Sequence, residues 1–215
     1  TNPPNETREL LDDIKAGTER AASLTRQLLA FSRRQVLQSR QLDLNDIVTS
    51  LTKMLQRILG EDVRLQLNLA SHPLLTRADA GMLDQILLNL IVNSRDAMPG
   101  GGQLTIETTD RILTTEDVAT ISDASVGHYI CLRVTDTGSG IQPELLSRIF
   151  EPFYTTKEPG KGTGLGLATV FGIVKQHGGY IPVASPSGKG PNFQAFLRAD
   201  PVSQLPNGTA AQLGH

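Results

Sequence analysis

The chain has 215 residues, of which 39% are hydrophobic, and its 20 basic and 22 acidic side chains give a formal net charge of −2. This composition suits one domain with an extension, and the lack of a basic excess and of tryptophan argues against a nucleic-acid partner. The single cysteine, Cys131, fits a reducing compartment, and no apolar run reaches membrane-spanning length. We therefore expect a cytoplasmic chain without direct membrane contact, which leaves open a membrane anchor in a longer protein.

A heptad-like seam predicts one long helix over residues 6–34. Its apolar and small residues recur at alternating spacings of four and three, namely Leu10, Ile14, Gly17, Ala21, Leu24, Leu28 and Phe31. Such a narrow seam is typical of a coiled coil, so we favour one helix of a dimeric bundle. The alternative is a helix that lies on its own domain.

Helical periodicity and strict alternation divide the rest of the chain. An apolar helical face follows Asp43 and ends at Gly60, which predicts a helix between them. Further helices are predicted at about 80–98 and 164–177, and strands at 63–69, 103–109, 129–135, 180–184 and 193–197. Pro182 indicates that its strand lies at a sheet edge or contains a bulge. The polar segment from Pro201 is expected to be a mobile tail or a linker.

About five strands with interspersed helices indicate an α/β fold. Because the strands alternate between apolar and polar residues, each is expected to have one covered face and one more open face. This pattern favours a two-layer sandwich over a doubly wound parallel sheet. We divide the chain into the long helix at 1–40, the α/β domain at 41–200 and the tail at 201–215.

Polar residues form a separate stripe on the predicted helix at 80–98. Asn89, Asn93 and Asp96 are spaced four and three residues apart and lie next to the apolar face. Carboxamide oxygens can bind Mg²⁺, an ion that keeps several waters and binds substrate phosphates. The alternative is a solvated polar face, although two asparagines inside a helix are poor for helix propensity.

Two glycine clusters lie further along the chain. The first, Asp136-Thr-Gly-Ser-Gly140, follows a predicted strand, where Asp136 either points into a pocket or forms an ordinary turn. The second, Gly162-Thr-Gly-Leu-Gly166, opens the last predicted helix, where free N–H groups can bind phosphates. Neither cluster fits the P-loop or the dinucleotide fingerprint.

In order along the chain, four segments resemble the boxes of sensor histidine kinases, which belong to the GHKL ATPase superfamily. Asn89-Leu-Ile-Val-Asn93 resembles the N box, Asp136–Gly140 the G1 box, Phe150-Glu-Pro-Phe153 the F box and Gly162–Leu167 the G2 box. The resemblance covers about residues 6–198 and is closest to PAS-linked, often hybrid, kinases. It implies a Bergerat-type ATP-binding fold, with a mixed sheet and helices on one face. The helix at 6–34 resembles the second helix of the family's dimerisation and phosphoacceptor hairpin.

The resemblance also implies roles for single residues. Asn93 would coordinate Mg²⁺ at the ATP phosphates, with Asn89 and Asp96 nearby, and Asp136 would accept a hydrogen bond from the adenine amino group. Lys157 would reach the phosphates, the alternative being an exposed lysine of the lid, which would span about 139–163. The other nucleotide-binding residues would be Gly138, Gly140, Ile141, Thr163, Leu165, Leu167, the lid anchors Phe150 and Phe153, and the glycines Gly162, Gly164 and Gly166.

Two departures from the family pattern stand out. The helix that carries the phosphorylated histidine is missing, and no other histidine substitutes for it, whether His72, His128, His177 or His215. We therefore expect this chain to bind ATP without phosphorylating itself. Near the end, Gly188-Lys-Gly-Pro-Asn-Phe193 replaces the usual Gly-x-Gly-Thr-x-Phe.

The resemblance implies transfer of the ATP γ-phosphate to a histidine in a longer, homodimeric protein, for relay to a response regulator or receiver domain. Hydrolysing relatives in the superfamily carry a glutamate four residues before the metal-binding asparagine. Asn89 holds that position here and is a poor base, so we expect slow hydrolysis. The alternatives are a superfamily ATPase or anti-sigma-type serine kinase, and a nucleotide-binding scaffold without transfer activity.

Overall fold

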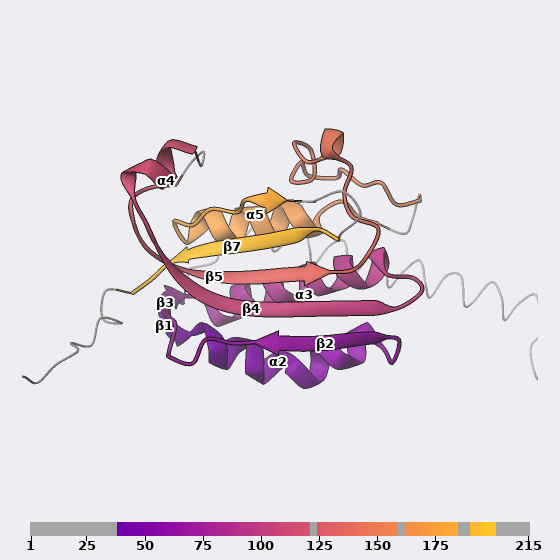
Figure 1. Cartoon of the computed structure of the whole chain (residues 1–215), viewed down its shortest axis with the longest axis horizontal. Helices are drawn as coiled ribbons and strands as arrows, with labels where there is room; N and C mark the ends of the chain where they lie inside the picture. Colours follow the sequence, from indigo (N-terminus) through magenta and orange to yellow (C-terminus); the bar gives the residue numbers. More distant parts are fainter. Residues whose placement is uncertain (1–37, 121–123, 159–161, 185–189, 201–215) are drawn as a thin grey trace, which may run out of the picture.

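A mixed five-stranded sheet forms the centre of the fold. We describe residues 38–120, 124–158, 162–184 and 190–200 of a computed structural model. The strand order is β2 (Val63–Asn68), β4 (Gly102–Leu113), β5 (Gly127–Asp136), β7 (Asn192–Arg198) and β6 (Val183–Ala184). β2 and β4 are parallel, and the other neighbours are antiparallel (Figure 1).

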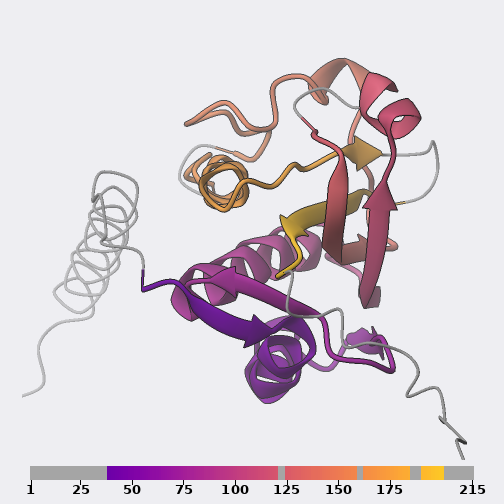
Figure 2. The same ribbon diagram turned by 90° about the vertical axis from the view of Figure 1, so that its left-hand side faces the viewer.

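Three helices cover one face of this sheet, and they match the predicted helices to within two residues at each end. They are α2 (Leu44–Leu59), α3 (Ala80–Ala97) and α5 (Gly166–Gln176), and Figure 2 shows α3 and α5 on the same side of β4 and β5. The carboxylates of Asp43 and Asp79 accept hydrogen bonds from backbone N–H groups in the first turns of α2 and α3, both at 2.9 Å. These caps satisfy donors that a helix start leaves free, which fixes where both helices begin.

The core lies between the sheet and the helices. Alternate residues of β5, including Ile130 and Leu132, belong to one buried cluster with Ile86 and Leu90 of α3, and each is at most 2% exposed. Burying such a side chain contributes about 1.5–3 kcal/mol. The alternation in the sequence therefore fixes which face of the sheet the helices cover.

The opposite face of the sheet carries a smaller buried cluster. It consists of Leu113, Tyr129, Cys131, Tyr180 and Phe196. Tyr180 stacks on Phe196 at 4.4 Å between ring centroids and meets Tyr129 edge-on at 5.3 Å. Cys131 is buried, as its apolar run predicts, and this burial raises the pKa of its thiol to about 12.

Short elements were not predicted. β1 (Arg40–Asp43) pairs antiparallel with β3 (Leu75–Ala78), and α4 (Thr115–Thr120) and the 3₁₀ helix η1 (Pro143–Leu145) are added. Segments of three to six residues contain too little periodicity to be recognised.

Pro182 lies at the sheet edge, as its sequence position indicates. The predicted strand at 180–184 shortens to β6, the last strand in the sheet order, which begins directly after Pro182. Proline has no N–H to donate to a neighbouring strand, so regular pairing cannot include it.

The predicted two-layer sandwich, with a mixed five-stranded sheet and helices on one face, is confirmed. The predicted helix at 6–34, the tail at 201–215 and the start of the Gly188–Phe193 segment lie outside the described residues. In the part of the chain that the structure describes, no helix has both the length and the apolar character that a membrane span requires.

Candidate functional site

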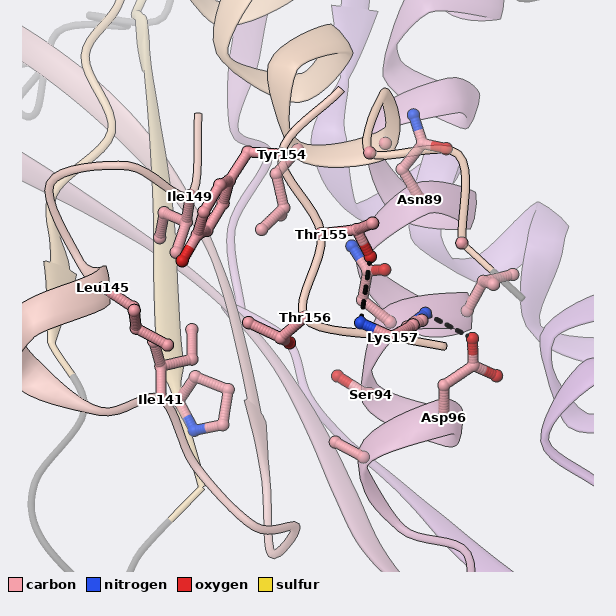
Figure 3. Close-up of a pocket in the computed structure, with 18 of the residues that line it drawn as sticks. Asn89, Ser94, Asp96, Ile141, Leu145, Ile149, Tyr154, Thr155, Thr156 and Lys157 are labelled. Carbon is pink, nitrogen blue, oxygen red and sulfur yellow. Dashed lines mark hydrogen bonds and ion pairs between the residues drawn. The ribbon is translucent and has the colours of Figure 1, made fainter. Parts of the chain in front are cut away.

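A cavity of about 690 Å³ lies between α3, the segment that follows β5 and the start of α5. Figure 3 shows side chains of α3 on one side and residues of the segment after β5 on the other. The volume is within the range of small-molecule sites. Residues far apart in the sequence thus form one concave surface.

Most of the predicted site residues lie on the cavity wall. They are Asn89, Asn93, Asp96, Asp136, Gly140, Ile141, Lys157, Gly162, Thr163, Gly164, Gly166 and Leu167. Gly138, Phe150, Phe153 and Leu165 are not among the lining residues.

Asp136, the last residue of β5, is buried at one end of the cavity and is only 3% exposed. Its Oδ1 accepts the Gly138 N–H at 2.9 Å, and its Oδ2 is buried without a hydrogen-bond partner among the described residues. Burial raises the pKa of this carboxyl, and the Gly138 N–H and the nearby Ser94 hydroxyl only partly offset that effect. Since an unpaired buried acceptor is costly, this corner suits a ligand that donates an N–H.

Apolar side chains also line much of the cavity. Ile141, Leu145 and Ile149 lie on the side opposite α3 in Figure 3, and Phe193 at the start of β7 adds to the lining. A mostly apolar lining with a few polar groups is typical of small-molecule sites, so this part of the cavity suits a weakly polar group.

Two asparagines of α3 face the start of α5. A first side-chain carbon on Gly166 would lie 3.6 Å from Asn93 Nδ2 and 3.8 Å from Asn89 Oδ1, so both amides approach the first residue of α5. Leu165, the residue before the helix, provides no side-chain cap. The first N–H groups of the helix therefore supply an anion-binding end next to two amides.

A lysine and an aspartate meet on the cavity wall. Lys157 Nζ donates to Asp96 Oδ2 at 2.5 Å, and Arg95 Nη2 donates to Asp96 Oδ1 at 2.7 Å. Partial burial alone would raise the pKa of Asp96, but hydrogen bonds and charges from Lys157 and Arg95 outweigh it and lower that pKa. Asp96 is therefore a charged, fully partnered carboxylate.

Gly138 and Leu165 do not line the cavity, but each is adjacent in the sequence to residues that do. A side chain on Gly138 would approach the carbonyl oxygen of Ala97 to 2.6 Å, and Ser139 N donates to that oxygen at 3.2 Å. Leu165 is 3% exposed. Gly138 lets the turn after β5 pack on the last residue of α3, which holds Asp136 at the cavity.

The two phenylalanines of the Phe150–Phe153 segment differ in whether their side chains are packed against the domain. Phe150 packs on Phe171 of α5 with ring centroids 5.1 Å apart, in keeping with an anchor. Phe153 is 64% exposed, so its side chain does not match the predicted anchor. Its backbone instead has a φ of +68° and donates to Gly164 O at 2.9 Å. Gly164, with a φ of +65°, leaves room for this contact, which any side chain there would block.

Sequence reasoning did not single out several lining residues, although those between 139 and 156 lie within the predicted lid. They are Val92, Ser94, Ala97, Ser139, Gln142, Leu145, Ile149, Tyr154, Thr155, Thr156, Pro191 and Phe193. Apolar members of this set look like ordinary core residues in the sequence. Tyr154 could have been found from its place between Phe153 and Lys157, and Arg148 lies over its ring at 4.3 Å.

The described histidines are engaged away from the cavity wall. His72 Nε2 and His128 Nε2 lie 3.3 Å and 3.0 Å from the two carboxylate oxygens of Asp110. His177 Nδ1 lies 2.8 Å from Ile173 O, and its Nε2 accepts the Asp79 N–H at 3.3 Å. His215 lies outside the described residues.

Known proteins have sequences similar to this chain. The chain is 48% identical over 187 residues to the sensor kinase CckA of Brucella abortus, an alignment that covers 86% of the chain and 20% of that protein. It is 34% identical to the sensor histidine kinase ZraS of Salmonella typhi, covering 89% of the chain and 38% of that protein. The chain thus spans less than half the length of these relatives.

Solved structures share the fold. Full-length ShkA, solved in complex with AMPPNP, has a TM-score of 0.70 and 25% identity, covering 93% of this chain and 41% of that one. The mycobacterial sensor histidine kinase MprB has a TM-score of 0.57 and 22% identity, covering 75% and 99%. The family described as histidine kinase-, DNA gyrase B- and HSP90-like ATPase matches residues 78–201. Since this match covers more than half of the chain, the protein belongs to that family of ATPases.

Proposed function

We propose that this chain is the ATP-binding catalytic domain of a two-component sensor histidine kinase. In the longer protein it would transfer the γ-phosphate of ATP to a histidine, for relay to an aspartate of a response regulator or receiver domain. One observation carries the proposal: a single cavity combines a buried carboxylate, whose second oxygen is unpaired among the described residues, with asparagine amides beside an uncapped helix start.

The Asp136 end would bind adenine. A purine ring would lie against the apolar side chains of Ile141, Leu145 and Ile149, and its amino group would donate to Asp136 Oδ2. A carboxylate that accepts such a bond selects bases that carry an amino group, because a carbonyl at that position would leave two acceptors facing each other.

The α5 end would bind the phosphates. The first N–H groups of α5 and the macrodipole favour negative charge there. Mg²⁺ bound to the phosphates would neutralise their charge during transfer, with Asn93 as its protein ligand and Asn89 beside it. No cluster of three metal-ligating side chains is found among the described residues, which fits an ion held mainly by phosphates and water. The bound AMPPNP of ShkA supports this use of the shared fold.

The bases available on the cavity wall support slow hydrolysis of ATP. The described carboxylates on the wall are Asp96 and Asp136. Asp96 is held by two cations, and Asp136 is buried and assigned to the base. Asn89 cannot take a proton from water at neutral pH. We therefore propose slow hydrolysis for this chain.

We also propose the domain limits 1–40, 41–200 and 201–215, with homodimerisation of the longer protein through the helix at 6–34 and a cytoplasmic location. Contacts at both ends of the second unit support its limits. Gln41 Nε2 donates to Asp200 Oδ2 at 3.2 Å, and Asp200 N donates to Leu75 O at 2.9 Å.

Calorimetric titration of the chain with AMPPNP and Mg²⁺ tests the site. We expect binding that Asn93→Ala and Asp136→Ala each weaken strongly, while Asp117→Asn, in an ion pair between β4 and α4, leaves it unchanged. Absence of binding, or equal binding by all variants, would refute the assignment. The transfer step needs a longer protein that includes an acceptor histidine, in which label from [γ-³²P]ATP should reach that histidine.

A further inference from the structure

Lys157 makes hydrogen bonds at both its backbone N–H and its ammonium group. Its backbone N donates to Thr155 Oγ1 at 3.2 Å, and its Nζ donates to Asp96 Oδ2 at 2.5 Å (Figure 3). Between these ends, the chain at Gly162 runs against the lysine stem, where an added side-chain carbon would lie 3.1 Å from Lys157 Cδ. A free lysine side chain samples many rotamers, so the bond to Asp96 orders a side chain that is about one-third exposed.

Asp96 is in turn held in place by its own helix neighbour. Arg95 Nη2 and Nε donate to Asp96 Oδ1 at 2.7 Å and 3.1 Å, which leaves Oδ2 for Lys157. The carboxylate therefore stands between two cations. Without it, Arg95 and Lys157 would repel each other, and Lys157 would lose the partner that fixes its charged end.

The pair lies beside the proposed phosphate end of the cavity. Asp96 follows Asn93 by three residues on the same stripe of α3, a rise of about 4.5 Å along the helix. An ammonium group has three donors, and the bond to Asp96 uses one of them. Lys157 can therefore keep Asp96 as its partner and still donate to a phosphate oxygen.

We infer that Asp96 is a positioning residue that holds the Lys157 ammonium in place for the phosphates of the bound nucleotide. This inference rests on the proposed function. Its physical basis is preorganisation: because Lys157 is already ordered in the free protein, binding loses less side-chain entropy.

The sign of the Asp96→Asn effect separates this role from two others. A carboxylate near phosphates repels them, and an ion pair that had to break on binding would compete with them. In either of those cases, neutralising Asp96 strengthens nucleotide binding. In the positioning role, the same substitution weakens it.

The experiment is a double-mutant cycle on the whole chain with Asp96→Asn, Lys157→Met and both together, titrated with Mg²⁺-AMPPNP and with adenosine. We expect Asp96→Asn to weaken AMPPNP binding about twofold to fivefold, the size of a partly exposed charge interaction, and to leave adenosine binding unchanged. In the Lys157→Met background, Asp96→Asn should weaken AMPPNP binding no further. Asp96→Glu should restore part of the affinity, and Asp117→Asn serves as the matched charge control.

Each other outcome overturns the inference. Tighter or unchanged AMPPNP binding by Asp96→Asn would show repulsion, competition or no coupling. An equal loss of adenosine affinity would show a general structural role. If Asp96→Asn weakened AMPPNP binding as much in the Lys157→Met background as in the wild type, Asp96 would act through another group. A wild-type chain that binds neither ligand would refute the proposed function itself, and the inference with it.

Discussion

The Asp136→Asn substitution is expected to weaken nucleotide binding without weakening the fold. In the free protein, Asp136 Oδ1 accepts the Gly138 N–H at 2.9 Å, and an amide oxygen can take over that role. Burial raises the pKa of this carboxyl, so its charged form is disfavoured by the surroundings. The new NH₂ group would face the buried Ser94 hydroxyl, which has no hydrogen-bond partner among the described residues. We therefore expect an equal or higher free energy of unfolding at neutral pH.

The loss in binding can be sized from the bond that would disappear. A hydrogen bond to a charged acceptor contributes about 1.5–3 kcal/mol, which corresponds to about 10–150-fold in Kd. Calorimetry with Mg²⁺-AMPPNP measures this loss, and urea unfolding without nucleotide measures stability. A matched comparison uses ATP and inosine triphosphate, whose base carries a carbonyl instead of the amino group. The wild-type chain should prefer ATP, and the variant should lose most of that preference.

Two results would contradict this reasoning. If the variant bound ATP and inosine triphosphate as the wild type does, Asp136 would not contact the base. If it lost more than about 1 kcal/mol of unfolding free energy together with affinity for both nucleotides, Asp136 would act through the fold.

Three further predictions concern stability and the lid. Gly164→Ala should lower nucleotide affinity and unfold the chain at lower urea concentration. The added methyl would collide with the Phe153 backbone, and alanine is strained at the φ of +65° that Gly164 adopts; an unchanged midpoint in urea would contradict this. Leu90→Ala, at a fully buried position of α3, should cost about 2–5 kcal/mol in urea unfolding, whereas truncating the half-exposed Met54 should cost far less. The stability advantage of Asp136→Asn should be absent well below pH 3.8, the ordinary pKa of the carboxyl. This advantage should grow as the pH rises from there through the raised folded-state pKa. Over that range the folded wild type must give up a proton that the unfolded chain has already lost, so the stability of the wild type falls. An advantage independent of pH would refute the link to Asp136 ionisation.

Periodic features of the sequence were sufficient for most of the fold. The apolar face of α3 and the alternation in β5 each extend over enough residues to specify both an element and its buried side. β1 and β3 could not be predicted in this way, because each has only four residues and they pair with each other across a separation of more than 30 residues.

Part of the candidate site could also be predicted from the sequence, and part could not. The pattern alone left Asn89, Asn93 and Asp136 with ordinary alternatives, and the resemblance to the boxes of sensor histidine kinases assigned them to one site. Their placement on one wall is seen only in the structure. The exposed side chain of Phe153 depends on a backbone conformation that phenylalanine rarely adopts, and the pairing of Asp96 with Lys157 joins residues that the sequence places 61 apart. Neither has a local signal.

The parallel pairing of β2 with β4 affects the order in which the protein can fold. Val63 pairs with Gly102 only after α3 has crossed between the two strands, whereas β4 and β5 approach through the much shorter segment between Leu113 and Gly127. Closing a longer loop costs more conformational entropy, and this cost precedes the stabilising contacts between the strands. We therefore expect β4 and β5 to pair early and β2 to join late, so the edge strand β2 should exchange its amide hydrogens faster than the central strands.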